Sequence, residues 1–169
     1  DIGTYKNLYF GKKNFHKQFN QPAAFLDRDG VINYDHGYVH KMRNFDLRFN
    51  VIKGLKYLNK INYNIFIVTN QSGIARGIFT ENEYLIFYRS IKEYFFKEGC
   101  FINDMQYSPF LKGATIKKYD KSSRLRKPGN LMLVNLIDKW VVNKKKSFML
   151  GDHKKDQLAA EKSNLFFEY

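Results

Sequence analysis

Short runs of apolar residues recur along the chain and predict buried strands. These runs lie at 23–26, 65–68, 148–150 and 165–167, and a further strand is expected over 102–107. Continuous apolar runs of this length, without strict alternation of polar residues, are typical of strands covered on both faces of a parallel sheet. The runs therefore predict buried strands.

Between the first strands, the apolar positions follow helical spacing. A helix is expected over 51–60 with Asn50 as its cap, and a second one begins where Thr80 and Glu83 fit a capping box. The second helix carries a stripe of aromatic and apolar side chains at helical spacing: Tyr84, Phe87, Tyr88, Ile91 and Phe95. We interpret this stripe as a face that packs into the core.

The later part of the chain continues the alternation of strands and helices. Pro128 is expected in the first turn of a helix that ends near Trp140, and a short helix is expected between the last two apolar runs. The alternation predicts an α/β fold, a Rossmann-like parallel sheet with helices on both faces. Residues 22–169 are expected to form a single domain, preceded by a polar, basic and aromatic N-terminal arm over 1–21.

Polar residues follow three of the apolar runs. They are Asp27, Thr69 with Asn70, and Asp152. Because ligands of such sheets bind beyond the carboxyl ends of the strands, we expect these residues at one shared edge. The stretch FLDRDGVIN also places Asp29 close to Asp27. Two such acids repel each other and do not stabilise the fold, so we expect either a cation between them or a catalytic role for one of them.

These residue types suit phosphoryl transfer, in which catalysis is mostly positioning and electrostatic stabilisation. The carboxylates of Asp27, Asp29 and Asp152 are the oxygen ligands that Mg²⁺ prefers. One carboxylate can act as the nucleophile and form an aspartyl-phosphate, while a second protonates the leaving oxygen and later activates water. Lys127 adds a fixed positive charge, and the chain has no GxxxxGK[ST] loop of the Walker type.

Four motifs resemble, in order, those of the haloacid dehalogenase-like phosphatases. They are Asp27-x-Asp29-Gly30, Thr69-Asn70, Lys127-Pro128 and Gly151-Asp152-x-x-x-Asp156. The resemblance covers residues 23–167 and implies that Asp27 is the nucleophile and Asp29 the acid/base. It also implies that Thr69 or Asn70 holds phosphate with Lys127, and that Mg²⁺ binds Asp27, Asp152 and the backbone carbonyl of Asp29. Asp156 would be a supporting acid.

Longer stretches resemble one group of this superfamily more closely. DRDGVIN at 27–33, DHGYVH at 35–40, TNQSGIARG at 69–77 and RKP at 126–128 are similar to the D-glycero-D-manno-heptose 1,7-bisphosphate 7-phosphatases. That resemblance implies a cytoplasmic enzyme of nucleotide-activated heptose synthesis for surface polysaccharide. It implies that the sugar phosphate is bound by Asp35, His36, Gly37, Tyr38, Gln71, Ser72 and Arg126.

The chain departs from this group in three places. Members commonly carry a zinc loop with three cysteines and a histidine before Arg-Lys-Pro, whereas residues 107–120 contain neither Cys nor His. No zinc is therefore expected there, because the usual ligands are absent. His153 follows Asp152 where a lysine is common, and the short C-terminus predicts that a last helix is missing. The gaps between the motifs are too short for a separate cap domain, which predicts an open site.

The net charge of the chain favours one class of ligand and does not identify the function. The formal net charge of +13 favours an anionic ligand, and an AT-rich coding sequence would also explain much of it. Three alternatives to the heptose enzyme stay open: a histidinol-phosphate phosphatase, a nucleic-acid 3′-phosphatase, and a non-catalytic binding protein on the same fold. A steep salt dependence of substrate binding would identify the second alternative.

The expected partner is a small-molecule sugar phosphate, bound by a monomer in the cytoplasm, and no membrane partner is expected. A nucleic acid is not the expected partner, but the net charge of +13 does not exclude it. The single cysteine, Cys100, permits no internal disulfide and fits a reducing compartment. No apolar run approaches the ~20 residues that span a bilayer, and the residues given contain no recognisable secretory signal.

Overall fold

The structure, a computed structural model, describes residues 20–169, so nearly all of the expected arm at 1–21 lies outside the described residues. A five-stranded sheet with the order β3-β2-β1-β4-β5 forms its centre, and every pair of neighbouring strands is parallel. The strands are β1 (Ala23–Leu26), β2 (Asn64–Asn70), β3 (Asp104–Ser108), β4 (Phe148–Leu150) and β5 (Phe166–Glu168). The expected parallel sheet is confirmed.

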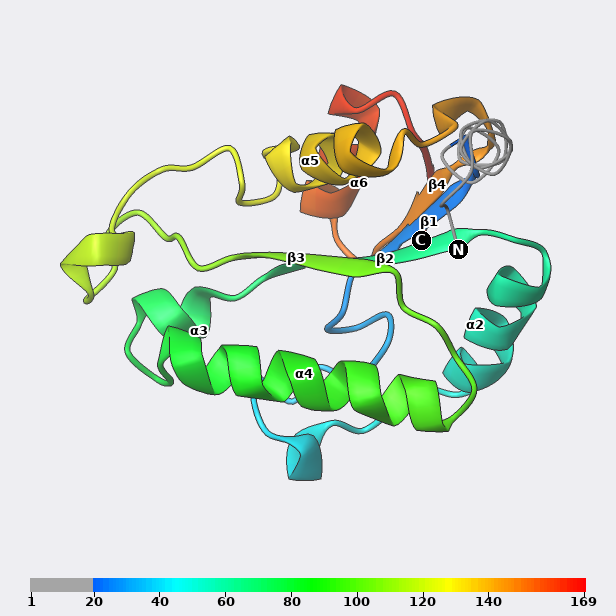
Figure 1. Cartoon of the computed structure of the whole chain (residues 1–169). Helices are drawn as coiled ribbons and strands as arrows, with labels where there is room; N and C mark the ends of the chain where they lie inside the picture. The colour runs from blue at the N-terminus through cyan, green and yellow to red at the C-terminus, as the bar shows by residue number, and fades with distance from the viewer. Residues whose placement is uncertain (1–19) are drawn as a thin grey trace, which may run out of the picture.

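Helices cover both faces of this sheet (Figure 1). One face packs against α2 (Val51–Lys60) and α4 (Glu81–Lys97), with the short helix α3 (Ser72–Ala75) beside them. The other face packs against α5 (Leu131–Trp140) and α6 (Lys154–Lys162). Each face has its own apolar core, and the predicted stripe of α4 contributes four fully buried side chains, Tyr84, Phe87, Ile91 and Phe95.

Two details of the helices differ from the expectations. Asn50 precedes α2 in a left-handed conformation, with φ of 61°, and its side chain makes no capping hydrogen bond. Pro128 lies before α5, which begins only at Leu131. The capping box of α4 is confirmed, because Thr80 Oγ1 accepts from the Glu83 amide at 3.1 Å and Glu83 Oε2 accepts from the Thr80 amide at 2.7 Å.

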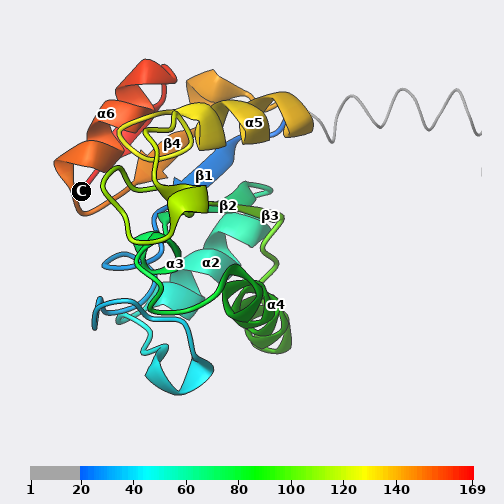
Figure 2. The same ribbon diagram turned by 90° about the vertical axis from the view of Figure 1, so that its left-hand side faces the viewer.

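The loops at the carboxyl edge of the sheet contain only short helical turns. The segment after β1 includes a 3-10 turn at Met42–Asn44, and the segment after β3 includes one at Lys117–Tyr119. At the opposite edge of the sheet, a further turn, Lys144–Lys146, precedes β4. Figure 2 looks onto the carboxyl edge, where the two longer loops flank the ends of the strands. Within residues 20–169, no helix is both long and apolar enough to cross a membrane.

Candidate active site

The pairing of β1 with β4 brings the first and last motifs together. Leu26 pairs with Leu150, and the Asp27 amide donates to the Leu150 carbonyl at 2.9 Å. The strand order runs outward in both directions from these two strands, which makes their boundary the topological switch point of the sheet. Ligand sites of open α/β sheets lie at such a point, because the loops diverge there to opposite faces. Asp27 is the first residue after β1, and Asp152 is the second residue after β4, so both lie at this switch point.

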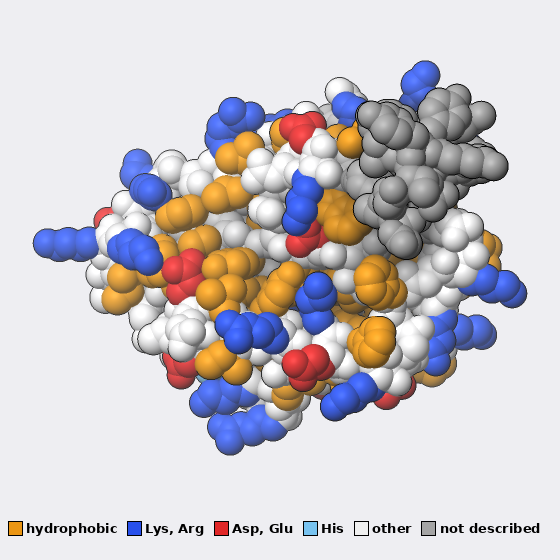
Figure 3. Space-filling view, viewed as in Figure 1, with side chains coloured by type: hydrophobic (Ala, Val, Ile, Leu, Met, Phe, Trp, Pro, Cys, Tyr) orange, Lys and Arg blue, Asp and Glu red, His pale blue; other side chains and the backbone are white. Residues whose placement is uncertain are grey.

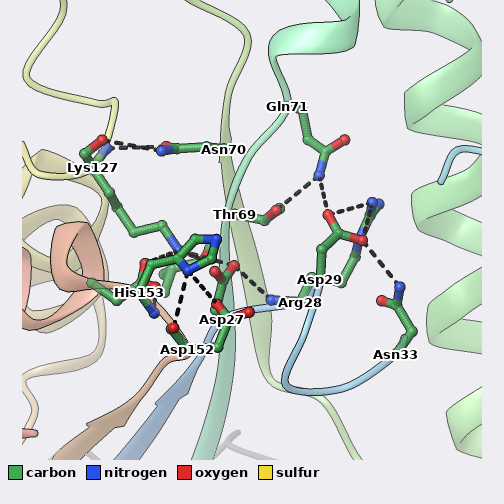
Figure 4. A network of polar contacts seen from close by, with 12 residues as sticks. Asp27, Arg28, Asp29, Asn33, Thr69, Asn70, Gln71, Lys127, Asp152 and His153 are labelled. Carbon is green, nitrogen blue, oxygen red and sulfur yellow. Dashed lines mark hydrogen bonds and ion pairs between the residues drawn. The ribbon is translucent and has the colours of Figure 1, made fainter. Parts of the chain in front are cut away.

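Lys127 lies between two buried acids in the middle of this edge (Figure 4). Its Nζ is 2.9 Å from Asp27 Oδ1 and 2.7 Å from Asp156 Oδ1, and it also donates to the Val68 carbonyl at 2.9 Å. All three side chains are buried, so one positive charge faces two negative charges with little solvent. Burial raises the pKa of Asp27 to about 6; Lys127 opposes this rise, and Asp156 adds to it.

Oxygen atoms of three acids gather beside this lysine and fit a magnesium ion. Asp27, Asp152 and Asp156 each place one carboxylate oxygen within 4.8 Å of the other two. Asp156 already forms an ion pair with Lys127 and accepts from the His153 amide at 3.1 Å, whereas Asp152 is partly exposed. A hard cation fits this donor set, because it is all oxygen and carries an excess negative charge.

Asp29 is held away from this group by its own set of donors (Figure 4). Arg28, whose side chain is completely buried, contacts both carboxylate oxygens of Asp29 through Nη2, at 2.8 and 2.7 Å. Asn33 donates to Oδ1 at 3.0 Å and Gln71 donates to Oδ2 at 3.1 Å. The Arg28 guanidinium also lies over the ring of Phe87 at 5.2 Å, which anchors it against α4.

Sequence reasoning had not assigned Arg28 a role. The signal that could have found it is an arginine enclosed by two acids directly after a buried strand, since a buried arginine requires an ionic partner.

The two residues of the second motif point to different partners. Both belong to β2 itself, which extends to Asn70, so they do not follow the strand as expected. Thr69 is buried, and its Oγ1 accepts from Gln71 Nε2 at 2.8 Å. The amide of Asn70 pairs with the backbone of Lys127, donating to its carbonyl at 3.1 Å and accepting from its N–H at 3.0 Å. Asn70 therefore fixes the position of Lys127, and the following Lys127-Pro128 peptide is cis.

A cavity of about 340 Å³ opens above these groups. Among the residues assigned by sequence, it is lined by Asp27, Asp29, Asp35, Gly37, Tyr38, Thr69, Asn70, Gln71, Ser72 and Arg126. Lys127 contacts Asp27, and Asp152 and Asp156 each place a carboxylate oxygen within 4.8 Å of one in Asp27.

His36 does not line this cavity, because its Nε2 faces the Asp46 carboxylate at 3.5 Å on an exposed part of the loop. His153 and Lys155 do line it and had not been assigned. Both lie at the start of α6, between the two acids of the last motif, and that spacing could have indicated them.

Similarity to known proteins agrees with this geometry. No family model matches the chain. A D-glycero-beta-D-manno-heptose-1,7-bisphosphate 7-phosphatase of Photorhabdus laumondii subsp. laumondii is 41% identical over 139 residues, which cover 82% of this chain and 74% of that protein.

Among solved structures, a protein of Mesorhizobium loti described as a HAD-like phosphatase has a TM-score of 0.80 at 29% identity, over 86% of this chain and 70% of that one. The D,D-heptose 1,7-bisphosphate phosphatase of B. bronchiseptica, complexed with magnesium and phosphate, has a TM-score of 0.77 at 22% identity, over 87% of this chain and 79% of that one, and supports the fold. The extent of the sequence identity shows that this chain belongs to the family of D-glycero-beta-D-manno-heptose-1,7-bisphosphate 7-phosphatases.

Proposed function

We propose that this protein is a Mg²⁺-dependent phosphatase that removes the 7-phosphate of D-glycero-D-manno-heptose 1,7-bisphosphate. The observation that carries the proposal is the buried carboxylate of Asp27, paired with Lys127 at 2.9 Å at the base of an open polar cavity, in a chain of this family. A carboxylate in that position can reach a phosphate that enters from the cavity. The product would serve nucleotide-activated heptose synthesis for surface polysaccharide.

In the first step, a carboxylate oxygen of Asp27 attacks phosphorus, the bond to the sugar oxygen breaks, and an aspartyl-phosphate forms. Asp29 enters this step in the protonated form that the second step regenerates, and it gives that proton to the leaving sugar oxygen. In the second step, Asp29 takes a proton from water, which attacks the phosphoryl group and restores Asp27. The contacts of Arg28, Asn33 and Gln71 keep the Asp29 side chain beside the cavity for both transfers.

Lys127 and Thr69 are the groups we assign to the transferring phosphoryl oxygens. The Lys127 ammonium is fixed by Asp156, by the Val68 carbonyl and by the pairing of its backbone with Asn70. A cation that is already oriented stabilises the transition-state charge without having to reorganise during the reaction. Asn70 acts in this scheme by holding Lys127.

Mg²⁺ would be held by Asp27, Asp152 and the backbone carbonyl of Asp29, with Asp156 in support. When bound, the ion neutralises charge on the nucleophile and on the phosphate, so that two anions can approach each other. This assignment fits the three carboxylate oxygens that gather beside Lys127. No zinc is needed in the loop at 107–120, which has none of the usual ligands.

The sugar part of the substrate would contact the rim of the cavity. Asp35, Gly37 and Tyr38 line it from the loop after β1, Gln71 and Ser72 from the start of α3, and Arg126 from the loop after β3. We retain His36 as a sugar contact, which requires its side chain to rotate away from Asp46.

The proposed site residues all come from one chain, so a monomer suffices for this function. The free thiol of Cys100 fits a cytoplasmic location.

The decisive experiment measures phosphate release with Mg²⁺ from both anomers of heptose 1,7-bisphosphate, from histidinol phosphate and from a 3′-phosphorylated oligonucleotide. We expect kcat/KM for a heptose bisphosphate to exceed the other values by at least about a hundredfold, and the activity to be lost in Asp27→Asn. Equal or better turnover of another substrate would refute the assignment of the sugar. No release that depends on both Mg²⁺ and Asp27 would refute the phosphatase.

A further inference from the structure

The loop at 109–126 borders the cavity, and its shape has to be maintained without a structural metal ion. It connects β3 to the segment of Lys127 and ends at Arg126, whose side chain lines the cavity. Such a loop has no regular hydrogen-bond ladder, and here it contains neither Cys nor His. Other side chains have to hold its shape if Arg126 is to keep a defined position.

The carboxylate of Glu81 is the group on which this loop converges. Glu81 Oε2 accepts from the Tyr119 hydroxyl at 2.7 Å, and Oε1 accepts from the Tyr107 hydroxyl at 3.0 Å. The Lys118 ammonium lies 3.4 Å from Oε2. Two of these three donors belong to the loop, and the third belongs to the end of β3. Hydrogen bonds to an ionised carboxylate are stronger than neutral ones, so Glu81 is a firm anchor.

The position of Glu81 is itself well fixed. It is the first residue of α4, directly after Thr80, whose capping box closes the first turn of the helix. Although partial burial alone would raise the pKa of Glu81, the bonds from Tyr119, Tyr107 and Lys118 hold it below its ordinary value. The carboxylate is therefore charged at neutral pH, which is the form that accepts from all three donors.

From Tyr119, a short path of contacts leads to Arg126. The Tyr119 carbonyl accepts from the Leu111 amide at 3.1 Å, and the Tyr119 ring packs against Phe110 with centroids 6.2 Å apart. The Phe110 carbonyl then accepts from Arg126 Nη1 at 3.2 Å. Each contact joins parts of the loop that are distant in sequence. The contacts therefore connect Glu81, through Tyr119 and Phe110, to the Arg126 guanidinium.

We propose that Glu81 is a positioning residue: it orders the loop at 109–126 through Tyr119 and thereby sets the Arg126 guanidinium toward the substrate. The effect on catalysis rests on the proposed function, in which Arg126 contacts the heptose bisphosphate. The effect on the loop itself does not depend on the substrate.

Kinetics of single and double variants test the link to Arg126. Glu81→Ala and Tyr119→Phe should raise KM for heptose bisphosphate, by about tenfold for Glu81→Ala, with kcat changed by less than about twofold. In an Arg126→Ala background, Glu81→Ala should have no further effect on KM, because residues that act through one contact are not additive. Glu93→Ala, an exposed acid on the same helix, is the matched control and should behave as wild type.

Limited proteolysis tests the loop independently of any substrate. The loop contains Lys112, Lys117, Lys118, Lys121 and Arg124 as trypsin sites. We expect trypsin to cut at these sites at least about fivefold faster in Glu81→Ala than in wild type or Glu93→Ala, with an unchanged circular dichroism spectrum. Tyr119→Phe leaves the helix intact and should give the same change in a weaker form.

Several outcomes would overturn the inference. Equal cleavage in Glu81→Ala and wild type would show that Glu81 does not order the loop. Faster cleavage with additive KM effects in the double variant would show that the loop does not act through Arg126. If the wild-type protein does not hydrolyse heptose bisphosphate, the proposed function is wrong. The proteolysis result still decides whether Glu81 orders the loop.

Discussion

At the scale of single residues, the buried group of Asp27, Lys127 and Asp156 dominates the electrostatics of the site. Asp27 and Asp156 compete for the same ammonium, at 2.9 and 2.7 Å, with almost no exposure to solvent. The group therefore carries an excess negative charge until a cation joins it. An excess buried charge is unfavourable for folding and favourable for binding a metal, because the same repulsion is relieved when the ion binds.

The first prediction concerns the stability of the metal-free protein. The folded pKa of Asp27, about 6, lies above the ordinary value of 3.8. The stability that neutral Asp27 contributes is complete below the ordinary value and is lost as the pH rises through about 6. Asp27→Asn stays neutral, so it should raise the Tm of the metal-free protein by about 3 °C at pH 7.5 and by about half as much at pH 5, where the loss is only partly complete.

Differential scanning calorimetry in a chelating buffer measures this difference. Mg²⁺ should raise the Tm of the wild type at pH 7.5 and should raise that of Asp27→Asn by less. If the Tm difference between the two proteins is the same at both pH values, the ionised Asp27 carboxylate is not the group that destabilises the metal-free protein.

At the scale of elements, the turn after β1 and the end of β4 approach so closely that a glycine is required. Gly30 has φ of +89°, and a Cβ placed on it would collide with Asp152 Oδ2. An L-residue is strained in this region of backbone space, and here it would also collide with a proposed metal ligand. The same turn carries Asp29, so the backbone at Gly30 links the two acids.

Gly30→Ala should therefore displace Asp152 and weaken Mg²⁺ binding. We expect kcat/KM at a fixed, limiting Mg²⁺ concentration to fall by about a hundredfold, with part of the loss recovered at high Mg²⁺. Gly99→Ala is the matched control: Gly99 has φ of +73° after α4, and its nearest neighbour, Lys56, is at an ordinary contact distance. Equal losses in the two variants would mean that backbone strain, rather than the collision with Asp152, is responsible.

At the scale of the whole molecule, the chain carries a formal net charge of +13. Figure 3 shows Lys and Arg side chains distributed around one face, with Asp and Glu side chains between them and no single basic stripe. A bound polyanion is favoured by a continuous basic track, whereas a distributed charge attracts small anions from all sides. On the face drawn, the side chains therefore form no continuous track for a polyanion.

Steering by this charge should depend on ionic strength. We expect kcat/KM for heptose bisphosphate to fall about threefold as KCl rises from about 50 to about 300 mM at constant free Mg²⁺, because added salt shortens the range of the attraction. The value of kcat should stay constant over that range. A kcat/KM that does not respond to salt would show that the net charge does not assist binding of the substrate.

Local patterns in the sequence determine the strands, most helices and the order of the motifs. The apolar runs predicted β1 and β4, and the stripe from Tyr84 to Phe95 predicted α4 with its buried face. These features depend on periodicity and on capping, which involve residues close together in the chain. The order of the four motifs indicated which residues would meet at the edge of the sheet.

Only the tertiary structure decided where the side chains at that edge point. It directs the Asn70 amide to the Lys127 backbone, and it turns His36 toward Asp46 and away from the cavity. It also brings Glu81 and Tyr119 together across a gap of 38 positions. Such contacts depend on the register between strands and on the packing of loops against them, and no local pattern of residue types encodes that geometry.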